Sequence, residues 1–518
     1  MSEKKSMLSS ISYVMIIMLL SRVLALVSSS MYVSFFGTED VYINIYSYAI
    51  TIPNTIFNCF GTTLSTIVIP IYASHIANKN YEGAKRFADN VITVSSVFTL
   101  LLVLCGMALS FLLPKYTAFD SGESYSFAVK SLMILMPVML FYGLNYIFQG
   151  MLQSVGKYGM PAFVSAPGSL LIILYVILFA DKYGVMGLVL VTAFGLSLQA
   201  LLLIPSLVKT GYRYRPVFDL LDDDMKTALG MMVPVLLGAS SYQINVFYNN
   251  SMAANFDGFV TVMTYVQNIV VYMVLAFVYS VTAVLYPKLT KAAAVGDMDE
   301  YKNALSSVLS NVWMLLLPIT AGFIAVRYEM LELVIGWGKN DAQSIEKAAI
   351  VMLLYSFSVV SVGSKEIVDR AFYSLKDTKL PAINGFIIMA ANIALSRVFM
   401  PFMGGYGLPL AYSVSSIIGL CVLLVLLRIK IGSFAKGCAG NFIKCTVSAA
   451  FMYGVVTLVR NVLPDVFTAN AAFDKVLSLA ILCTVGVVVY GVMIVVLRVS
   501  SATEVIDKIK RKFAKGGI

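Results

Sequence analysis

The sequence contains a single histidine, His75, among 518 residues. A single histidine leaves histidine-containing metal clusters and His-based catalytic triads little to work with. No stretch follows the pattern GxxxxGK[ST], which binds the phosphates of ATP. We therefore predict a protein that is not an enzyme and holds no cofactor or metal. A transporter without an ATP site would draw its energy from a coupling ion, the membrane potential or consumption of the product.

Charged residues are also scarce. Asp, Glu, Lys and Arg make up only 12% of the chain, whereas 59% of its residues are hydrophobic and the mean hydropathy is +0.86. Soluble globular proteins do not have this composition. Apolar runs follow one another from Ile11 to Val499, and each is about 20 residues or longer, as a transmembrane helix requires. A β-barrel would need short alternating strands instead. We predict an all-α polytopic membrane protein.

The net charge and the cysteines of the sequence limit the kinds of partner and cross-link that we expect. The formal net charge is +10, but the basic residues are dispersed among short loops, which indicates membrane topology and no nucleic-acid partner. The six cysteines mostly fall inside apolar segments, so buried free thiols are favoured over disulfides.

The apolar runs predict fourteen transmembrane helices. They lie at 11–36, 42–76, 91–113, 126–152, 160–180, 184–208, 227–254, 259–289, 304–327, 346–374, 380–401, 406–428, 438–463 and 475–498. With the N-terminus (1–10) in the cytoplasm, the cytoplasmic loops carry most of the Lys and Arg, and the opposite loops carry mainly acids. Both termini are then cytoplasmic. The basic tail, 501–518, is either a surface helix on anionic headgroups or a solvated segment.

The chain also repeats itself. Pro70 and the following IYASHIANKNYEGAK correspond, 217 positions later, to Pro287 and KLTKAAAVGDMDEYK. SVGKYGMPA at 154–162 corresponds, at an offset of 220, to SLKDTKLPA at 374–382. These matches predict two parallel six-helix repeats, both starting from the cytoplasmic side. The predicted organisation is an N-lobe at 11–208, a cytoplasmic linker at 209–226, a C-lobe at 227–428 and two extra helices at 438–498.

Polar groups gather in the first two helices of each repeat. A charged side chain such as Arg22 inside a bilayer normally faces a bundle interior or a watery cavity, although snorkelling to the headgroups is the alternative. An amide-rich cavity suits a large hydroxylated ligand, whereas single amides can also join helices. The predicted substrate-binding residues are Arg22, Ser28, Ser29, Asn44, Asn54, Asn58, Gln243, Asn249, Gln267 and Asn268.

The tenth predicted helix carries four charges. Lys365 with Asp369, and Glu366 with Arg370, are i,i+4 pairs, so each charge has a partner one turn away. The spacing leaves three roles open: a structural ion pair, a gate or a ligand contact.

Several stretches carry a family resemblance. SRVLALVSSSMYVSFFG (21–37), PVLLGASSYQINVFYN (234–249), LYPKLTKAAAVGDMDEY (285–301) and RAFYSLKDTKLP (370–381) resemble the MurJ/MviN family. That family comprises lipid II flippases of the multidrug/oligosaccharidyl-lipid/polysaccharide exporter superfamily. The resemblance implies fourteen helices in two lobes and a central cavity for the disaccharide-pentapeptide diphosphate. It also implies a groove beside helices 13 and 14 for the polyprenyl tail. The expected setting is a monomer in the bacterial cytoplasmic membrane, near the cell-wall synthesis machinery.

The chain departs from the family at charged positions. Arg22 matches the first family arginine, but the Arg-Asp that follows falls on Ser28 and Ser29. The family's helix 2 arginine falls near Phe57 or Asn58, and its helix 8 Asp-Arg falls on Gln267 and Asn268. Groups that would meet a diphosphate by charge-assisted hydrogen bonds are thus neutral here.

The predicted function is flipping of lipid II by alternating access, with binding of membrane lipids at the surface. The main alternative is another polyprenyl-linked glycan, such as a teichoic acid, capsule or exopolysaccharide unit. An ion-coupled small-molecule exporter and a scaffold without transport are more distant alternatives.

Overall fold

A computed structural model describes residues 2–272, 274, 275, 278, 289, 292, 293, 295–375, 377–433, 438–462 and 472–499. Every regular element in these ranges is a helix. Nine helical segments of the described chain are long and apolar enough to cross a membrane. One of the nine, Lys379–Ile431, holds two successive helices, α16 (Lys379–Met403) and α17 (Gly407–Ile431). The prediction of an all-α multi-pass membrane protein is therefore confirmed.

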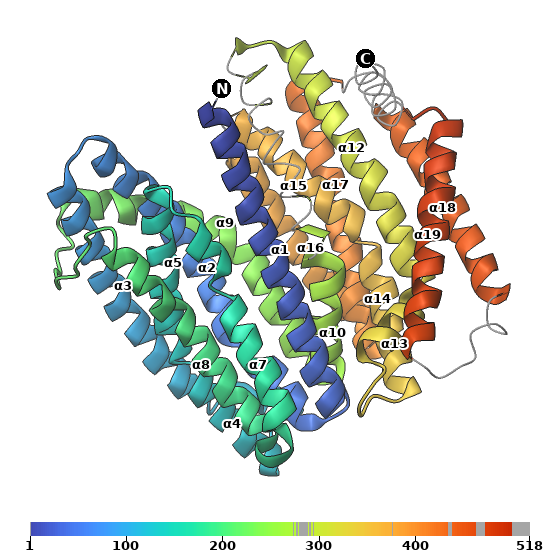
Figure 1. Ribbon diagram of the computed structural model, residues 1–518, viewed down its shortest axis with the longest axis horizontal. Helices are drawn as coiled ribbons and strands as arrows, with labels where there is room; N and C mark the ends of the chain where they lie inside the picture. The colour runs from blue at the N-terminus through green and yellow to red at the C-terminus, as the bar shows by residue number, and fades with distance from the viewer. Residues whose placement is uncertain are drawn as a thin grey trace. The chain divides into compact units, whose positions relative to one another are not determined.

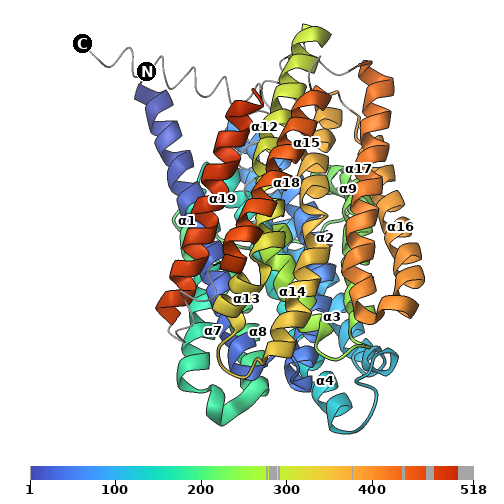
Figure 2. The same cartoon turned by 90° about the vertical axis from the view of Figure 1, so that its right-hand side faces the viewer.

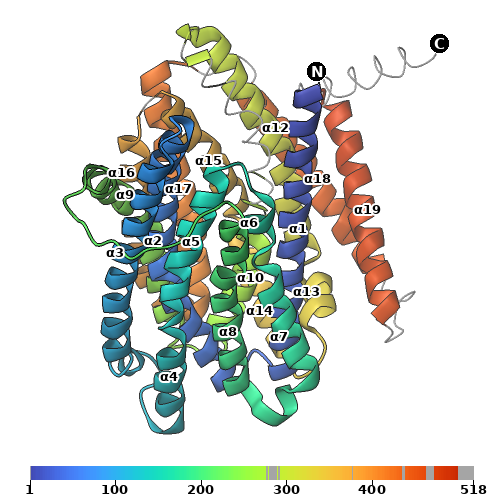
Figure 3. The ribbon, with the colours of Figure 1, turned by 60° about the vertical axis from the view of Figure 1, so that its left-hand side comes forward.

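The first of two compact units comprises the chain up to Thr264 together with Gly338–Asn340. Its helices are α1 (Ser2–Phe36), α2 (Val41–Ala77), α3 (Tyr81–Leu109), η1 (Leu113–Tyr116), α4 (Gly122–Leu135), α5 (Val138–Ser154), α6 (Gly159–Phe163), α7 (Ala166–Leu178), α8 (Ala180–Val208), α9 (Asp223–Ala253) and the start of α10 (Phe259–Gln267). Helix α2 packs against α3, α4, α5 and α9 (Figure 1), and α7 packs between α1 and α8 (Figure 3).

Short polar turns separate these helices, and acidic or amide side chains cap several of them. Asp40 accepts a hydrogen bond from the backbone N–H of Ile43 at the start of α2, and Asn80 caps α3 in the same way. Such caps satisfy backbone donors that the first helical turn leaves without a partner. The apolar helices can therefore begin within a few residues of one another.

The predicted linker at 209–226 is tied to α3. Tyr212 donates a 2.6 Å hydrogen bond to Asp89 Oδ1, and Asn90 exchanges two hydrogen bonds with the backbone of Asp219. Burial, reinforced by the Asp89 carboxylate, raises the pKa of the Tyr212 hydroxyl. Tyr212 also belongs to a buried cluster with Phe87 of α3. The linker is thus an ordered strap over one end of unit 1.

The second unit comprises Tyr265–Trp337 and the chain from Asp341. Its helices are the end of α10, the π-helix η2 (Asn268–Tyr272), α12 (Met298–Ala325), α13 (Arg327–Ile335), α14 (Ala342–Ser356), α15 (Val359–Ser374), α16, η3 (Gly404–Tyr406), α17, α18 (Cys438–Val462) and α19 (Ala472–Val496). Helices α16 and α17 lie side by side, and α18 packs against α12 and α19 (Figure 2).

A tight turn reverses the chain between α16 and α17. Gly404 has a φ of +57°, which L side chains rarely adopt, and a Cβ at Gly407 would lie 2.8 Å from the backbone nitrogen of Met400. Two glycines therefore allow the sequence to pack two spans directly against each other.

Several predicted boundaries differ from those observed. The span at 126–152 is two helices, α4 and α5, which meet at Pro137, because proline cannot donate the backbone hydrogen bond that a continuous helix needs. Helix α1 begins at Ser2 rather than at residue 11. The division by contacts groups α9 with unit 1, so the division into two six-helix lobes remains a prediction. The tail at 501–518 and Pro287 lie outside the described residues.

Candidate functional site

The ten predicted substrate-binding residues fall in both units. Eight of them lie on α1, α2 and α9 of unit 1, whereas Gln267 and Asn268 lie in unit 2.

Two tyrosines of α5 hold two of the predicted asparagines of α2. Tyr142 donates a 2.5 Å hydrogen bond to Asn54 Oδ1, and Tyr146 donates a 3.1 Å hydrogen bond to Asn58 Oδ1. The asparagines are four residues apart on α2 and the tyrosines four apart on α5, so the two bonds lie one turn apart. Sequence reasoning missed both tyrosines, although their spacing matches that of the asparagines.

Gly61 makes room for the contact between Tyr146 and Asn58. A Cβ at Gly61 would lie only 1.9 Å from the Tyr146 ring, so this ring packs directly against the α2 backbone. The side chain of Arg22 is exposed, and its guanidinium lies within electrostatic range of the Tyr146 hydroxyl. No acidic side chain in the described part of the chain pairs with Arg22. Arg22, Tyr146 and Asn58 therefore form a polar group with an uncompensated positive charge.

The two predicted serines of α1 bond to their own helix. Ser28 donates to the carbonyl of Ala25 at 2.8 Å, and Ser29 donates to that of Leu26 at 2.9 Å. Each hydroxyl oxygen keeps acceptor capacity, but its single proton is already used. These serines therefore offer a substrate acceptors and no free donor in the described conformation.

Helix α9 supplies an amide pair and a cavity wall. Asn249 donates to Asn245 Oδ1 at 3.1 Å, while its own Oδ1 is buried with no partner among the described residues. Gln243 lines a cavity of about 330 Å³ together with apolar residues of α2, including Ile52, Ile56 and Phe60. The structure thus brings Gln243 to a largely apolar cavity rather than to the Tyr146 group.

Asn44 is fully engaged with the backbone. Its amide nitrogen donates to the carbonyls of Thr38 and Asp40 at 2.8 and 2.9 Å, and its oxygen accepts from the Thr261 N–H at 3.2 Å. The Thr261 hydroxyl also lies 3.0 Å from that of Ser47. This geometry favours the helix-joining role that the sequence left open for Asn44.

Residues 338–340 contact the C-terminal end of α1, near the start of α2. The Lys339 N–H donates to the Ser34 carbonyl at 2.9 Å, and Asn340 Oδ1 accepts from the Thr38 N–H at 2.8 Å. A Cβ at Gly338 would lie 2.2 Å from the Ser34 carbonyl oxygen, so only glycine allows this approach. We call Ser34, Thr38, Asn44, Ser47, Thr261 and Asn340 together the α1–α2 clamp.

In unit 2, the predicted amides lie at a change of helix type. Gln267 is the last residue of α10 and Asn268 the first of the π-helix η2. Short π-helical turns occur frequently at functional sites, because they alter the direction of neighbouring side chains. Gln267 is buried and Asn268 is half-buried.

The four charges of α15 form two ion pairs within that helix. Lys365 Nζ lies 2.6 Å from Asp369 Oδ2, and the Arg370 guanidinium lies 2.9 and 3.1 Å from Glu366 Oε1. Asp369 is buried, and its Oδ1 has no partner in the described part of the chain. Each charge is thus neutralised locally.

Comparisons with known proteins agree on one family. The family model described as lipid II flippase MurJ matches residues 32–474. The probable lipid II flippase MurJ of Vibrio cholerae is 24% identical over 78% of this chain and 80% of its own length. The probable lipid II flippase MurJ of Thermotoga maritima is 23% identical over 94% of this chain and 96% of its own length.

Solved structures show the same fold. A lipid II flippase MurJ in an inward closed conformation has a TM-score of 0.79 at 22% identity, covering 93% of this chain and 98% of that one. An inward-facing multidrug resistance MATE family transporter of the MOP superfamily has a TM-score of 0.68 at 16% identity, covering 80% of this chain and 98% of that one. Because the family model matches most of its length, the chain belongs to the MurJ family of lipid II flippases.

Proposed function

We propose that the protein is a flippase that moves lipid II from the inner to the outer leaflet of the bacterial cytoplasmic membrane by alternating access. The observation that carries the proposal is the family match over residues 32–474, on a chain whose fold follows that of a lipid II flippase over 93% of its length. Flipping changes no covalent bond, so the proposed protein is a transporter and not an enzyme. Monomeric action beside the cell-wall synthesis machinery is part of the same proposal.

The proposed architecture is fourteen spans in two parallel six-helix repeats, followed by α18 and α19 as helices 13 and 14. Support comes from the charges of the loops, which alternate between basic and acidic along the chain. The termini are then cytoplasmic. Parallel repeats allow one lobe to rock against the other around a site between them, and the groove beside α18 and α19 would take the polyprenyl tail.

The proposed binding group is centred on Arg22. A guanidinium binds phosphate oxygens by charge-assisted hydrogen bonds, and it is the natural partner for the diphosphate of lipid II. The amides of Asn54 and Asn58, oriented by Tyr142 and Tyr146, offer donors and acceptors for sugar and peptide groups. Gln243, Asn249, Gln267 and Asn268 complete the proposed set, with Ser28 and Ser29 as acceptors.

Alternating access would require the contacts of the α1–α2 clamp to break during each transport cycle. Thr261 bonds to Asn44, Ser47 and the carbonyl of Ile43, all near the start of α2. In the proposed topology this end faces away from the cytoplasm. We infer that the clamp is closed when the site is open to the cytoplasm, and that it opens during release to the outer leaflet.

A second candidate is flipping of another polyprenyl-linked glycan. The observation that favours it is the pair Ser28 and Ser29, which replace a charged family pair and use their protons within α1. A head group that presents less concentrated negative charge would need fewer cations at these positions.

Complementation tests the two candidates. The chain is expressed in a bacterium depleted of its own lipid II flippase, and growth is scored together with lipid II exposed on the outer leaflet. Restored growth with restored exposure is expected. If the protein is present in the membrane but no lipid II is exposed, the other glycan is favoured. A double variant carrying Ser28→Arg and Ser29→Asp then separates substrate choice from incompatibility with the host.

A further inference from the structure

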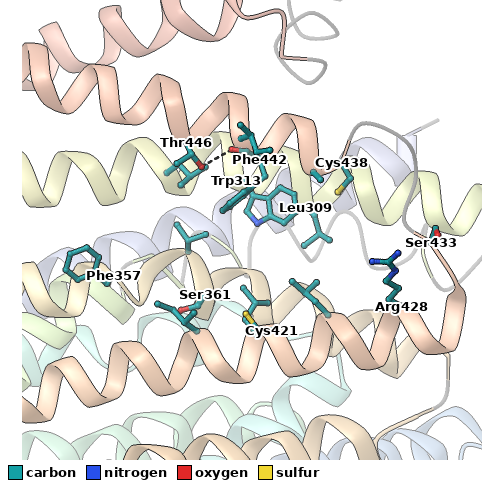
Figure 4. Close-up of a pocket in the computed structure, with 17 residues that line it drawn as sticks. Leu309, Trp313, Phe357, Ser361, Cys421, Arg428, Ser433, Cys438, Phe442 and Thr446 are labelled. Atoms are coloured by element: carbon teal, nitrogen blue, oxygen red, sulfur yellow. Dashed lines mark hydrogen bonds between the residues drawn. The ribbon is translucent and has the colours of Figure 1, made fainter. Parts of the chain in front are cut away.

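Unit 2 contains a pocket that the proposed transport cycle does not use. It has a volume of about 820 Å³ and lies between α12, α15, α17 and α18 (Figure 4). This volume is in the range of small-molecule sites, about 300–1,000 Å³. None of its described lining residues comes from α19. The pocket is therefore on the α17 side of α18, away from the groove that we propose beside α18 and α19.

The body of this pocket is apolar, although several lining residues carry polar atoms. The Trp313 ring packs edge-to-face on Phe442, with 5.0 Å between ring centroids, and its N–H donates to Ser364. The Ser361 hydroxyl donates to the carbonyl of Ser358, just before α15, at 2.8 Å, and the Thr446 hydroxyl donates to that of Phe442 at 2.9 Å. The donors are thus satisfied inside the protein, and hydrocarbon faces the pocket.

One end of the pocket is cationic. Of the seventeen described lining residues, only Arg428 carries a charge, and Figure 4 places it with Ser433 at the end opposite Phe357. Arg428 lies in the last turn of α17, where a span meets the headgroup region. Lys430, two residues later, is paired with Asp377. Arg428 is exposed and has no ion pair or hydrogen bond in the described part of the chain.

We propose that this pocket binds an anionic phospholipid of the bilayer, with its phosphate at Arg428 and an acyl chain along Phe442, Trp313 and Phe357. A soluble anion would leave the apolar body unfilled, and a neutral lipid would leave the guanidinium without its partner. Basic pockets between transmembrane helices are known to bind anionic headgroups, and arginine matches the geometry of phosphate oxygens. The proposal depends on the membrane setting and not on which lipid-linked glycan is transported.

Tryptophan fluorescence tests the proposal, because the sequence contains only two tryptophans. Trp337 is exposed and its N–H bonds only within its own turn, so Trp337→Phe leaves Trp313 as the single reporter in a folded chain. This full-length variant is placed in phosphatidylcholine nanodiscs with a small, equal fraction of brominated phosphatidylglycerol or brominated phosphatidylcholine. We expect quenching of Trp313 to show about a five-fold preference for the anionic lipid, as one basic side chain at a membrane surface provides.

Three substitutions in the reporter background then locate the headgroup. Arg428→Gln should abolish the preference, Arg428→Lys should keep most of it, and Lys430→Gln should keep all of it because Lys430 does not line the pocket. Cys421→Phe fills the pocket from α17 and should lower quenching by the anionic lipid. Because Cys421 is exposed, the larger side chain should leave the protein folded.

The proposal is overturned by equal quenching with the two brominated lipids, or by a preference that survives Arg428→Gln. It is also overturned if equimolar lipid II displaces brominated phosphatidylglycerol, since the polyprenyl tail would then be the occupant. Loss of flipping in complementation, with the anionic preference intact, would contradict the proposed function and leave this inference standing.

Discussion

The Tyr142 hydroxyl donates a 2.5 Å hydrogen bond to Asn54 Oδ1, and one helical turn away Tyr146 makes the corresponding 3.1 Å bond to Asn58. The tyrosines fix which face of each amide points outward. A carboxamide presents an acceptor on one side and two donors on the other, so its orientation decides what it can bind. In the proposed site, therefore, α5 controls the polarity that α2 presents to a substrate.

Removing these hydroxyls should impair transport and spare the fold. We expect Tyr142→Phe and Tyr146→Phe each to lower the rate of lipid II flipping about two- to tenfold, corresponding to about 0.5–1.5 kcal/mol for one hydrogen bond. The assay is lipid II exposure in cells or proteoliposomes. Tyr116→Phe at the exposed end of η1 is the matched control and should flip at the wild-type rate. Normal rates in both α5 variants would show that the asparagines need no orientation.

Sequence reasoning reached the membrane class, the family and the polar residues of α2 without the structure. It could not assign roles to single amides, because an asparagine that binds substrate and one that joins helices are identical in composition. Asn44 proved to be fully bonded to backbone, whereas Asn249 has a buried oxygen with no partner in the described chain. The contacts of Lys339 and Asn340 with α1 could not be predicted either, since they connect residues about 300 positions apart.

Arg22 is the residue on which the proposed site depends most. Arg22→Ala should abolish lipid II flipping and leave folded protein in the membrane, because the side chain is exposed and makes no ion pair among the described residues. Arg22→Lys keeps the charge without the two-pronged geometry that arginine offers to phosphate, so partial activity is expected. Binding of lipid II to the purified variants separates lost affinity from lost expression. Wild-type flipping by Arg22→Ala would refute the site assignment.

The α1–α2 clamp can be tested by locking it. The hydroxyls of Ser47 and Thr261 lie 3.0 Å apart and are buried, so cysteines at both positions are placed for a disulfide. Oxidation of the Ser47→Cys, Thr261→Cys double variant should stop lipid II flipping, and reductant should restore it. Each single variant under the same oxidant controls for the native cysteines. Flipping by a fully cross-linked chain would show that the clamp stays closed throughout transport.

Substitutions in the Lys365–Asp369 ion pair of α15 can distinguish a structural role from a role as a gate. Asp369→Asn leaves Lys365 partly buried without its counter-charge, and removal of one partner of a buried pair typically destabilises a protein by about 3–5 kcal/mol. Replacing both, as Lys365→Met with Asp369→Leu, should restore the melting temperature because no unpaired charge remains. Since the pair lies within one helix, we expect flipping to recover as well. A stable double variant that cannot flip would instead identify the pair as a gate.

The pair Asp377–Lys430 predicts a pH dependence outside the membrane. The hydrogen bond from Lys430 holds the pKa of the Asp377 carboxyl below its usual value, so the folded state favours the ionised form. The resulting stability is therefore present above about pH 4, the unfolded pKa, and is lost as the pH falls through the lower folded pKa. Both side chains are partly exposed and solvent screens them, so the contribution is about 0.5–1 kcal/mol.

Asp377→Asn isolates this charge, because asparagine still accepts the backbone hydrogen bonds that Asp377 receives from Lys379 and Leu380 at the start of α16. At pH 7 the variant should melt about 1–2 °C below the wild type. Between pH 4 and pH 2.5 the two melting temperatures should converge, since the wild-type carboxyl becomes neutral too. Lys430→Gln should reproduce the same convergence from the other partner. A difference that persists at pH 2.5 would mean that packing around the substituted side chain, rather than the ion pair, stabilises this turn.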